Sequence, residues 1–215
     1  MATSWGEPTN QQEAINWVEK ATRASDRFHQ VWEASHRHRA EHRGACTVYP
    51  SADGPLLGAM AGAARAKRIL EVGCGLGYSA LWLAHGAGAE ARVETIEADP
   101  SHAAIAEGNF AAEGLAGQIT ILAGRAAVVL RGLKGPYDVI YFDGDPIEAT
   151  DDLDNFERII RPGGLLISAN LFLGPFDPGM PGLEKTAEYR KRITAGDRWT
   201  TAWLQTGSKA LSIRR

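Results

Sequence analysis

The sequence predicts an α/β fold in which a mostly parallel β-sheet is covered by helices on both faces. Two observations support this prediction. Between residues 68 and 170, short segments that are apolar nearly throughout alternate regularly with segments of helical character. Strands that are buried on both faces have this composition, and a strict alternation of strands and helices is typical of a doubly wound parallel sheet.

The alternating elements can be placed by their apolar runs and by the turn residues between them. The expected strands are 68–72, 92–98, 118–124, 137–144 and 165–170. The expected helices between them are 78–85, 101–114, 125–133 and 148–160, and the sequence RPGG closes the last of these. Gly114 is expected to end its helix as a Schellman-type stop.

The two ends of the chain depart from this alternation. Residues 11–43 predict one long helix with a loosely spaced apolar face, and a second helix is expected at 56–66. Near the C-terminus, a helix at 184–193 precedes two strands, 198–205 and 209–215, which flank the turn TGS and should pair antiparallel. We expect one domain over residues 1–215, with covering helices in 1–66 and the α/β core in 67–215.

The composition excludes several classes of protein. A content of 44% hydrophobic and 23% charged residues is typical of a globular protein and not of a disordered chain. No segment has the length of uncharged apolar sequence that a membrane span needs, and the N-terminus does not resemble a signal peptide, so we expect a cytoplasmic protein without a membrane partner. The net charge of -3 gives no general attraction to nucleic acid.

Histidines gather in the stretch HQVWEASHRHRAEHR at residues 29–43. His38 and His42 are four residues apart, so they share a helix face, as two metal ligands would require. No third ligand can be placed beside them, and the spacing of the histidines and of Cys46 and Cys74 does not resemble a zinc motif. We therefore predict a solvated basic face without a metal, and we expect His102 to be a packing or surface residue.

The stretch ILEVGCGLGYSALWLA, residues 69–84, places three glycines between a strand and a helix. In a parallel sheet this turn lies at the carboxyl edge, where ligands bind. Because Gly73, Gly75 and Gly77 have no side chains, backbone N–H groups and the helix N-terminus can approach a ligand closely. A dinucleotide fingerprint would need glycine at position 78, where Tyr78 stands, and this argues against a pyrophosphate.

Acidic residues end two of the predicted strands. Glu97, in VETIEADP, ends the second strand and can accept both hydroxyls of a ribose. Asp143, in YFDGD, ends the fourth strand. Together with the glycine turn, these residues predict a site for an adenosine-containing cofactor.

Four blocks of this chain carry a family resemblance: ILEVGCGLGYSALWLA, VETIEADPSHAAIAEGNFAAEGL, YDVIYFDGD and IRPGGLLISAN. They resemble the small-molecule O-methyltransferases related to catechol and caffeoyl-CoA O-methyltransferases, which use S-adenosyl-L-methionine. The resemblance extends from about residue 47 to the C-terminus. It implies a Rossmann-like, seven-stranded sheet with the last strand inserted antiparallel, N-terminal helices over the active site, and a homodimer.

The resemblance also implies which residues bind the cofactor. Glu97 and the neighbouring Ala98 are expected at the ribose. The methionine end is expected to contact Glu71, Gly73, Gly75, Tyr78 and Ser79, and Gly77 and Asp143 are also expected to bind the cofactor. The segment beside the adenine is Gly124, Arg125 and Ala126, where Arg125 is expected to contribute through its backbone.

The chain departs from the family at the metal site. Catechol-type relatives hold a divalent cation by an aspartate after the fourth strand and an Asp-Asn pair after the fifth. Here Asp143 and Asn170 match, but Ala169 replaces the middle ligand, and Pro146 stands where these relatives have a lysine that helps to deprotonate the acceptor. Because Mg²⁺ prefers several oxygen ligands, we expect a metal-independent enzyme in which Asp143 is the catalytic residue.

The acceptor is expected to be a small, aromatic or phenolic molecule. Candidate residues that contact it are Asp145, Asn170 and Phe172, the last in the segment LFLGPFDPGMPG, which can form an apolar lid. Two alternatives stay open. One is an S-adenosylmethionine-binding protein with impaired catalysis, and the other is an NAD-dependent oxidoreductase, which Glu97 favours and Tyr78 opposes.

Overall fold

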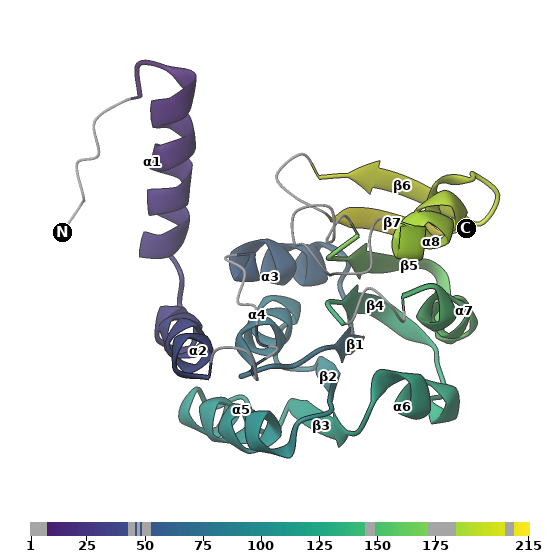
Figure 1. Cartoon of the computed structure of the whole chain (residues 1–215), viewed down its shortest axis with the longest axis horizontal. Helices are drawn as coiled ribbons and strands as arrows, with labels where there is room; N and C mark the ends of the chain where they lie inside the picture. The colour runs from purple at the N-terminus through teal and green to yellow at the C-terminus, as the bar shows by residue number, and fades with distance from the viewer. Residues whose placement is uncertain are drawn as a thin grey trace.

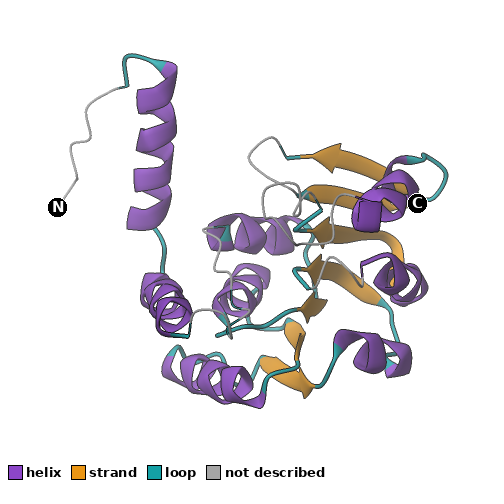
Figure 2. Ribbon diagram, viewed as in Figure 1, coloured by secondary structure: helices purple, strands orange, loops and turns teal. Residues whose placement is uncertain are grey.

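A seven-stranded sheet forms the centre of the molecule, with strand order β3-β2-β1-β4-β5-β7-β6 (Figures 1 and 2). The structure is a computed structural model that describes residues 8–42, 46, 48, 53–144, 149–171, 184–204 and 209–215. The strands are β1 (Arg68–Val72), β2 (Arg92–Glu97), β3 (Ile119–Ala123), β4 (Tyr137–Phe142), β5 (Ile160–Ser168), β6 (Trp199–Trp203) and β7 (Ala210–Arg214). The first five strands are parallel, and β7 lies antiparallel between β5 and β6. The predicted fold class is confirmed.

Helices cover both faces of this sheet (Figure 1). On one face lie α3 (Gly54–Ala63), α4 (Tyr78–Ala87) and α5 (Pro100–Ala112). On the other lie α6 (Ala126–Gly132), α7 (Ala149–Ile159) and α8 (Glu184–Thr194). Each face has its own hydrophobic core, one around Leu81 and Phe110 and the other around Phe156 and Tyr189. Two cores of this kind require strands that are apolar on both sides, which is the pattern seen in the sequence.

The N-terminal region differs from the prediction of one helix over 11–43. It forms two helices, α1 (Gln11–Ala24) and α2 (His29–Glu41), and α1 extends away from the rest of the molecule in Figure 1. The chain turns at Asp26, whose carboxylate accepts hydrogen bonds from the Phe28 backbone at 3.0 Å and from two side chains of α4. Phe28 is buried whereas Val18 is 57% exposed, so the apolar residues do not form one continuous face.

The sequence RPGG is a second difference, because it does not close α7 as a turn but belongs to β5. The strand pairing is irregular here. Tyr137 pairs with Ile160, but Val139, two residues further along β4, pairs with Leu165, five residues further along β5. Gly163, at φ +73°, allows this bulge, and the Arg161 guanidinium donates to Asp138 on β4 at 2.6 Å.

Two helix boundaries follow directly from single residues. Helix α3 begins at Gly54, two residues before the predicted start, because Pro55 is accepted in the first turn of a helix. Gly114, at φ +71°, follows α5 in the predicted Schellman arrangement: its own N–H bonds to the Ala111 carbonyl, and the next N–H bonds to the Phe110 carbonyl at 2.8 Å.

Two more expectations concern membranes and disulfides. In the part of the chain that the structure describes, no helix is both long enough and apolar enough to cross a membrane. Cys46 and Cys74 are both free thiols.

Candidate functional site

The glycine turn after β1 lies at the carboxyl edge of the sheet, and all three of its glycines have positive φ, between +54° and +97°. A Cβ on Gly73 would lie 2.7 Å from the Asp143 carbonyl oxygen, and a Cβ on Gly77 would lie 2.4 Å from the Phe110 ring. Both positions therefore require glycine for packing. At Gly75, by contrast, Val48 is the only described residue within 4 Å of such a Cβ. Gly75 thus presents bare backbone toward space that a ligand can fill.

Glu97 ties this turn to the end of β2. Its side chain is 10% exposed, and its two carboxylate oxygens accept hydrogen bonds from the backbone N–H groups of Gly75 at 2.8 Å and Asp99 at 2.9 Å. A carboxylate has lone pairs left after two such bonds, so it can still accept from hydroxyl groups of a ligand. Glu97, the residue predicted to bind the ribose, therefore lies directly beside the glycine turn.

The residues predicted to flank an adenine lie next to Glu97. Strand β3 pairs with β2 so that Ala123 lies opposite Glu97, and the Gly124 N–H donates to the Glu97 carbonyl at 2.8 Å. Ala98 and Arg125 are both exposed, and Ala126 begins α6. The structure thus brings the predicted ribose and adenine residues to one edge of the sheet.

Glu71 is a buried acid that lacks a full set of partners. It has no exposed surface, and the Thr95 hydroxyl donates to its Oε2 at 2.5 Å, while its Oε1 has no hydrogen-bond partner in the structure. Burial raises the pKa of Glu71 to about 8, although hydrogen bonds from Ser79 and Thr95 act in the opposite direction. An unpartnered buried acceptor is costly, so this oxygen fits a donor or a cationic group that arrives with a ligand.

Tyr78 was predicted at the methionine end, but its hydroxyl has a structural partner. It donates to Asp26 at 2.7 Å, and the indole N–H of Trp82 donates to the other Asp26 oxygen at 3.1 Å. This side chain therefore links α4 to the junction between α1 and α2.

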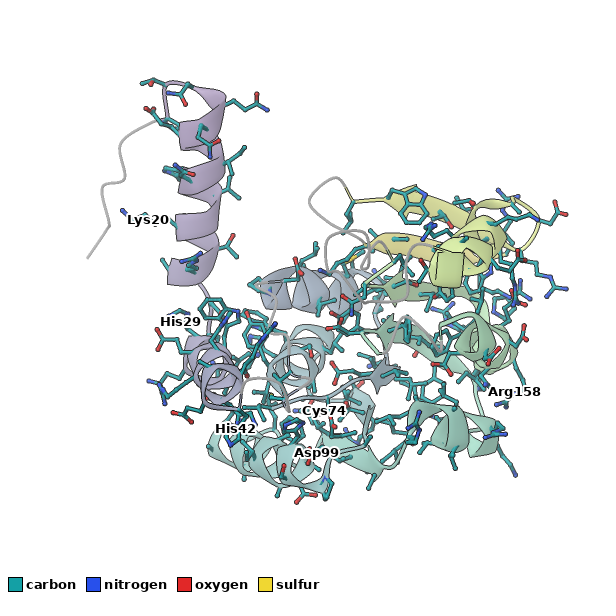
Figure 3. All side chains as sticks on the ribbon, viewed as in Figure 1. Lys20, His29, His42, Cys74, Asp99 and Arg158 are labelled. Atoms are coloured by element: carbon teal, nitrogen blue, oxygen red, sulfur yellow. The ribbon has the colours of Figure 1, made fainter. Side chains whose placement is uncertain are left out.

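In Figure 3, Cys74 marks the glycine turn and Asp99 marks the start of α5 on the same side of the molecule.

Asp143 lies directly after β4, and both of its carboxylate oxygens accept hydrogen bonds. The Tyr141 hydroxyl donates to one at 3.0 Å, and the Asn170 amide donates to the other at 2.6 Å. Asn170 has φ +60°, a conformation that asparagine tolerates better than most residues. Burial raises the pKa of Asp143 to about 6, against the lowering effects of Tyr141, Lys209 and Asn170.

Two charged residues near Asp143 were missed by the sequence analysis. Lys209 forms an ion pair with Asp53 at 2.5 Å, and the two affect the pKa of Asp143 in opposite directions, Lys209 lowering it and Asp53 raising it. Lys209 precedes β7, and the antiparallel pairing of Ala210 with Ser168 brings the start of β7 to the carboxyl end of β5. The predicted antiparallel insertion of the last strand could have indicated Lys209. An antiparallel strand begins at the sheet edge where the neighbouring parallel strand, here β5, ends.

Among the described residues after β4 and β5, few side chains can serve as ligands for Mg²⁺. Within the described residues, the positions that bind the cation in catechol-type relatives offer the carboxylate of Asp143 and the amide of Asn170. Ala169 has no side-chain oxygen and is 1% exposed, and the Asn170 amide presents an N–H to Asp143 instead of an oxygen to a shared cation. Mg²⁺ demands near-octahedral oxygen coordination, and this donor set does not fit that demand.

Two predicted acceptor residues, Asp145 and Phe172, lie outside the described residues, as does Pro146. Their roles remain predictions.

A parallel sheet with a glycine-opened turn after β1, and with acids after β2 and β4, defines an α/β enzyme that binds a nucleoside cofactor at the carboxyl edge. Residues 70–170 match a family model described as a methyltransferase domain. A protein of Mycobacterium tuberculosis assigned as an O-methyltransferase is 34% identical over 188 residues, which are 85% of this chain and 84% of the relative. A catechol O-methyltransferase of Niastella koreensis is 37% identical over 131 residues, 59% of each chain.

The fold is also that of solved methyltransferases. The crystal structure of the O-methyltransferase TomG from Streptomyces achromogenes, in complex with S-adenosylmethionine, has a TM-score of 0.79 at 24% identity and covers 96% of this chain and 99% of that one. The chain belongs to the class I S-adenosylmethionine-dependent O-methyltransferase family. Membership of this family supports a methyltransferase that uses S-adenosylmethionine and argues against the oxidoreductase alternative.

Proposed function

We propose that this enzyme methylates a hydroxyl group of a small aromatic or phenolic acceptor without Mg²⁺, with Asp143 as the general base. The observation that carries the proposal is the state of Asp143 at the carboxyl edge. Its pKa of about 6 keeps the carboxylate largely ionised at pH 7 and close to the pH at which a base is most effective.

Residues of β1, of the glycine turn after it and of the end of β2 fit the cofactor. Glu97 would hold the ribose, the bare backbone at Gly75 would contact the methionine portion, and the unpartnered oxygen of Glu71 would pair with the positively charged amino group at the methionine end. When bound, S-adenosylmethionine supplies a methyl group on a sulfonium, a leaving group that needs no metal. The glycine turn and the end of β2 are adjacent at one sheet edge, so one molecule can contact both.

The remaining residues act on the acceptor. Asp143 accepts the proton of the hydroxyl, and Tyr141 and Asn170 hold its carboxylate in one orientation through their hydrogen bonds. The positive charge of Lys209 is close enough to lower the pKa of Asp143, and it would also stabilise the negative charge that develops on the acceptor oxygen. Positioning the oxygen in line with the methyl group supplies much of the remaining rate enhancement.

Lys209 also supports independence from Mg²⁺. In the catechol-type mechanism a divalent cation provides positive charge beside the acceptor. Here the Lys209 ammonium provides a positive charge near Asp143, and its pairing with Asp53 holds it in place. In catechol-type relatives the residue at position 169 helps to bind the cation, and the lysine at position 146 helps to deprotonate the acceptor. Lys209 and Asp143 can therefore replace these two elements, which Ala169 and Pro146 remove.

The test is methyl transfer to a panel of simple phenols, benzoates and anilines, measured after removal of divalent cations and again with added Mg²⁺. We expect at least one phenol to be methylated, with a rate that Mg²⁺ changes by less than about twofold. A tenfold stimulation by Mg²⁺ would contradict the metal-independent mechanism. Tight binding of S-adenosylhomocysteine without transfer to any acceptor would instead favour the impaired-enzyme alternative.

We also propose that the enzyme is a homodimer in which α1 contributes to the interface. Helix α1 extends from the body in Figure 1, and Ile15 and Val18 are 45% and 57% exposed. Light scattering of the purified protein should give twice the mass of the chain. The variant Val18→Glu should shift the mass toward the monomer, whereas Glu107→Gln, an exposed change on α5, should leave it unchanged.

A further inference from the structure

Three potential metal ligands from distant parts of the sequence converge between α2 and α5. His38 lies on α2, Cys46 follows α2, and His102 lies in the first turn of α5. One ligand atom from each residue lies within 4.8 Å of the others. The Cys46 sulfur is 3.9 Å from the Nε2 of His102, and the rings of His38 and His102 are 5.2 Å apart, nearly edge to face.

These separations are close to those of an occupied zinc site. Zinc bonds to imidazole nitrogen at about 2.0 Å and to thiolate at about 2.3 Å in a tetrahedron, which places ligand atoms roughly 3.5 Å apart. The pair Cys46 and His102 is already near this value, and the widest pair needs to close by about 1 Å. Rotation of exposed or half-buried side chains is sufficient for such a change.

His102 is a buried histidine with two carboxylates near its second ring nitrogen, at distances longer than a hydrogen bond. Its side chain is 5% exposed, and its Nδ1 lies 3.9 Å from Glu97 and 4.0 Å from Asp99, while its Nε2 points to the Cys46 sulfur. Histidines that bind metals typically direct the second ring nitrogen to a carboxylate, which fixes the ring orientation. This arrangement is an observation independent of the convergence of the three ligands.

The other two ligands are also held in place. The Val48 N–H donates to the Cys46 sulfur at 3.4 Å, which helps to hold the sulfur in its position beside His102. The His38 ring stacks on His42 at 4.2 Å between centroids, and the Nδ1 of His42 donates to the His38 carbonyl at 2.9 Å. In Figure 3, His42 lies where the end of α2 approaches α5.

We propose that His38, Cys46 and His102 bind one Zn²⁺ ion, with a water molecule as the fourth ligand, and that this ion fastens α2 to the cofactor-binding half. A set of two imidazoles and one thiolate selects zinc or a similar borderline-soft metal over Mg²⁺ or Ca²⁺. The site is separate from the acidic edge at Asp143, and it does not depend on the proposed acceptor or on the proposed catalytic base. It reverses the sequence-based expectation of a solvated basic face.

The direct test is titration of the metal-free, full-length enzyme with Zn²⁺, followed by calorimetry and by metal analysis after gel filtration. We expect one equivalent to remain bound. At a free zinc concentration about a hundredfold above its dissociation constant, the Tm should rise by roughly 5 to 10 °C. Replacement of zinc by Co²⁺ should produce a thiolate-to-cobalt charge-transfer band in the near ultraviolet, which identifies a cysteine ligand without any mutation.

Variants identify the ligands. Cys46→Ser and His38→Ala should each weaken zinc binding by at least a hundredfold, and Cys46→Ser should abolish the charge-transfer band. His36→Ala is the matched control, because His36 is an exposed histidine on the same helix outside the cluster. It should bind zinc like the parent enzyme.

The proposal fails if the enzyme, after titration with Zn²⁺ and gel filtration, retains well under half an equivalent of zinc. It also fails if zinc binds with full stoichiometry but Cys46→Ser leaves the affinity and the cobalt spectrum unchanged. Neither outcome bears on Asp143 as the proposed base, although Glu97 lies beside His102 and so links the zinc site to the cofactor side. Measurements of the Mg²⁺ effect on activity should be made with the zinc content held constant, so that the two metal questions remain separate.

Discussion

The cofactor side and the acceptor side of the carboxyl edge are built in different ways. On the cofactor side, Glu97 holds the glycine turn through backbone N–H groups, and the residues that meet there come from 71–99 and 124–126. On the acceptor side, Asp143 depends on Asn170, Lys209 and Asp53, which come from separate segments of the chain. The proposed cofactor site therefore rests on backbone geometry at two adjacent strand ends, whereas the proposed base rests on charges from more distant segments of the chain.

The largest expected effect is that of Asp143→Asn, which tests the acceptor side alone. The variant keeps the size of the side chain but cannot accept the proton, so kcat should fall by about 10² to 10⁴. The dissociation constant for S-adenosylhomocysteine should stay within about twofold of the parent value, because the cofactor side is unchanged. In the parent enzyme kcat/KM should rise with pH through a midpoint near 6, as Asp143 ionises. Full activity of Asp143→Asn would exclude Asp143 as the base.

Glu97→Ala tests the cofactor side. It removes the acceptor for the ribose hydroxyls and the anchor of Gly75, so binding of S-adenosylhomocysteine should weaken by about tenfold or more, equal to about 1.4 kcal/mol. The matched control is Glu94→Ala, which removes a carboxylate from the same strand at a position that pairs with Arg68. Equal affinity of the Glu97 variant and the parent in calorimetry would remove the ribose assignment.

Glu71→Gln separates stability from binding on the cofactor side. The folded enzyme holds the proton of Glu71 up to a pKa of about 8, compared with an ordinary value of 4.5. The stability that this proton confers is complete below pH 4.5 and is lost as the pH rises to 8, where folding must bury a charge. Glutamine stays neutral, so the ligand-free variant should be more stable than the parent at pH 9, by roughly 2 to 5 kcal/mol or roughly 5 to 15 °C in Tm, because each unit of pKa difference corresponds to about 1.4 kcal/mol.

The same Glu71 variant should show little difference from the parent near pH 5, where both side chains are neutral. Thermal unfolding at the two pH values provides the measurement. A stabilisation of equal size at both would indicate a packing effect and contradict the assignment of a buried, titrating carboxyl group.

Lys209→Met is expected to have the smallest effect on the pH profile, and kcat should also fall because the positive charge proposed beside the acceptor oxygen is lost. Lys209 lowers the pKa of Asp143, so its removal should move the acidic limb of the kcat/KM profile upward, by about half a pH unit to one unit. Lys209→Arg keeps the charge and should leave the limb near its original position. A limb that does not move in Lys209→Met would show that this lysine does not act on the base.

Where the sequence predicted structure well, the determining interactions are local. Gly114 ends α5 because a left-handed residue suits glycine, and Glu97 at the end of β2 accepts a hydrogen bond from the Asp99 N–H two residues further along the chain. The N-terminal helix was predicted wrongly because its break depends on Asp26, whose partners Tyr78 and Trp82 lie 52 and 56 residues away. No pattern within residues 11–43 carries that information.

The sequence by itself determined the order of strands and helices, the glycine-opened turn and the acid beside it, since hydrophobic periodicity and glycine conformations act over a few residues. Only the tertiary structure decided which distant side chains meet. The insertion of β7 carries Lys209 to Asp143, and the approach of α2 to α5 sets His38 and Cys46 beside His102. Such contacts depend on how whole elements pack, and residue spacing along the chain does not encode them.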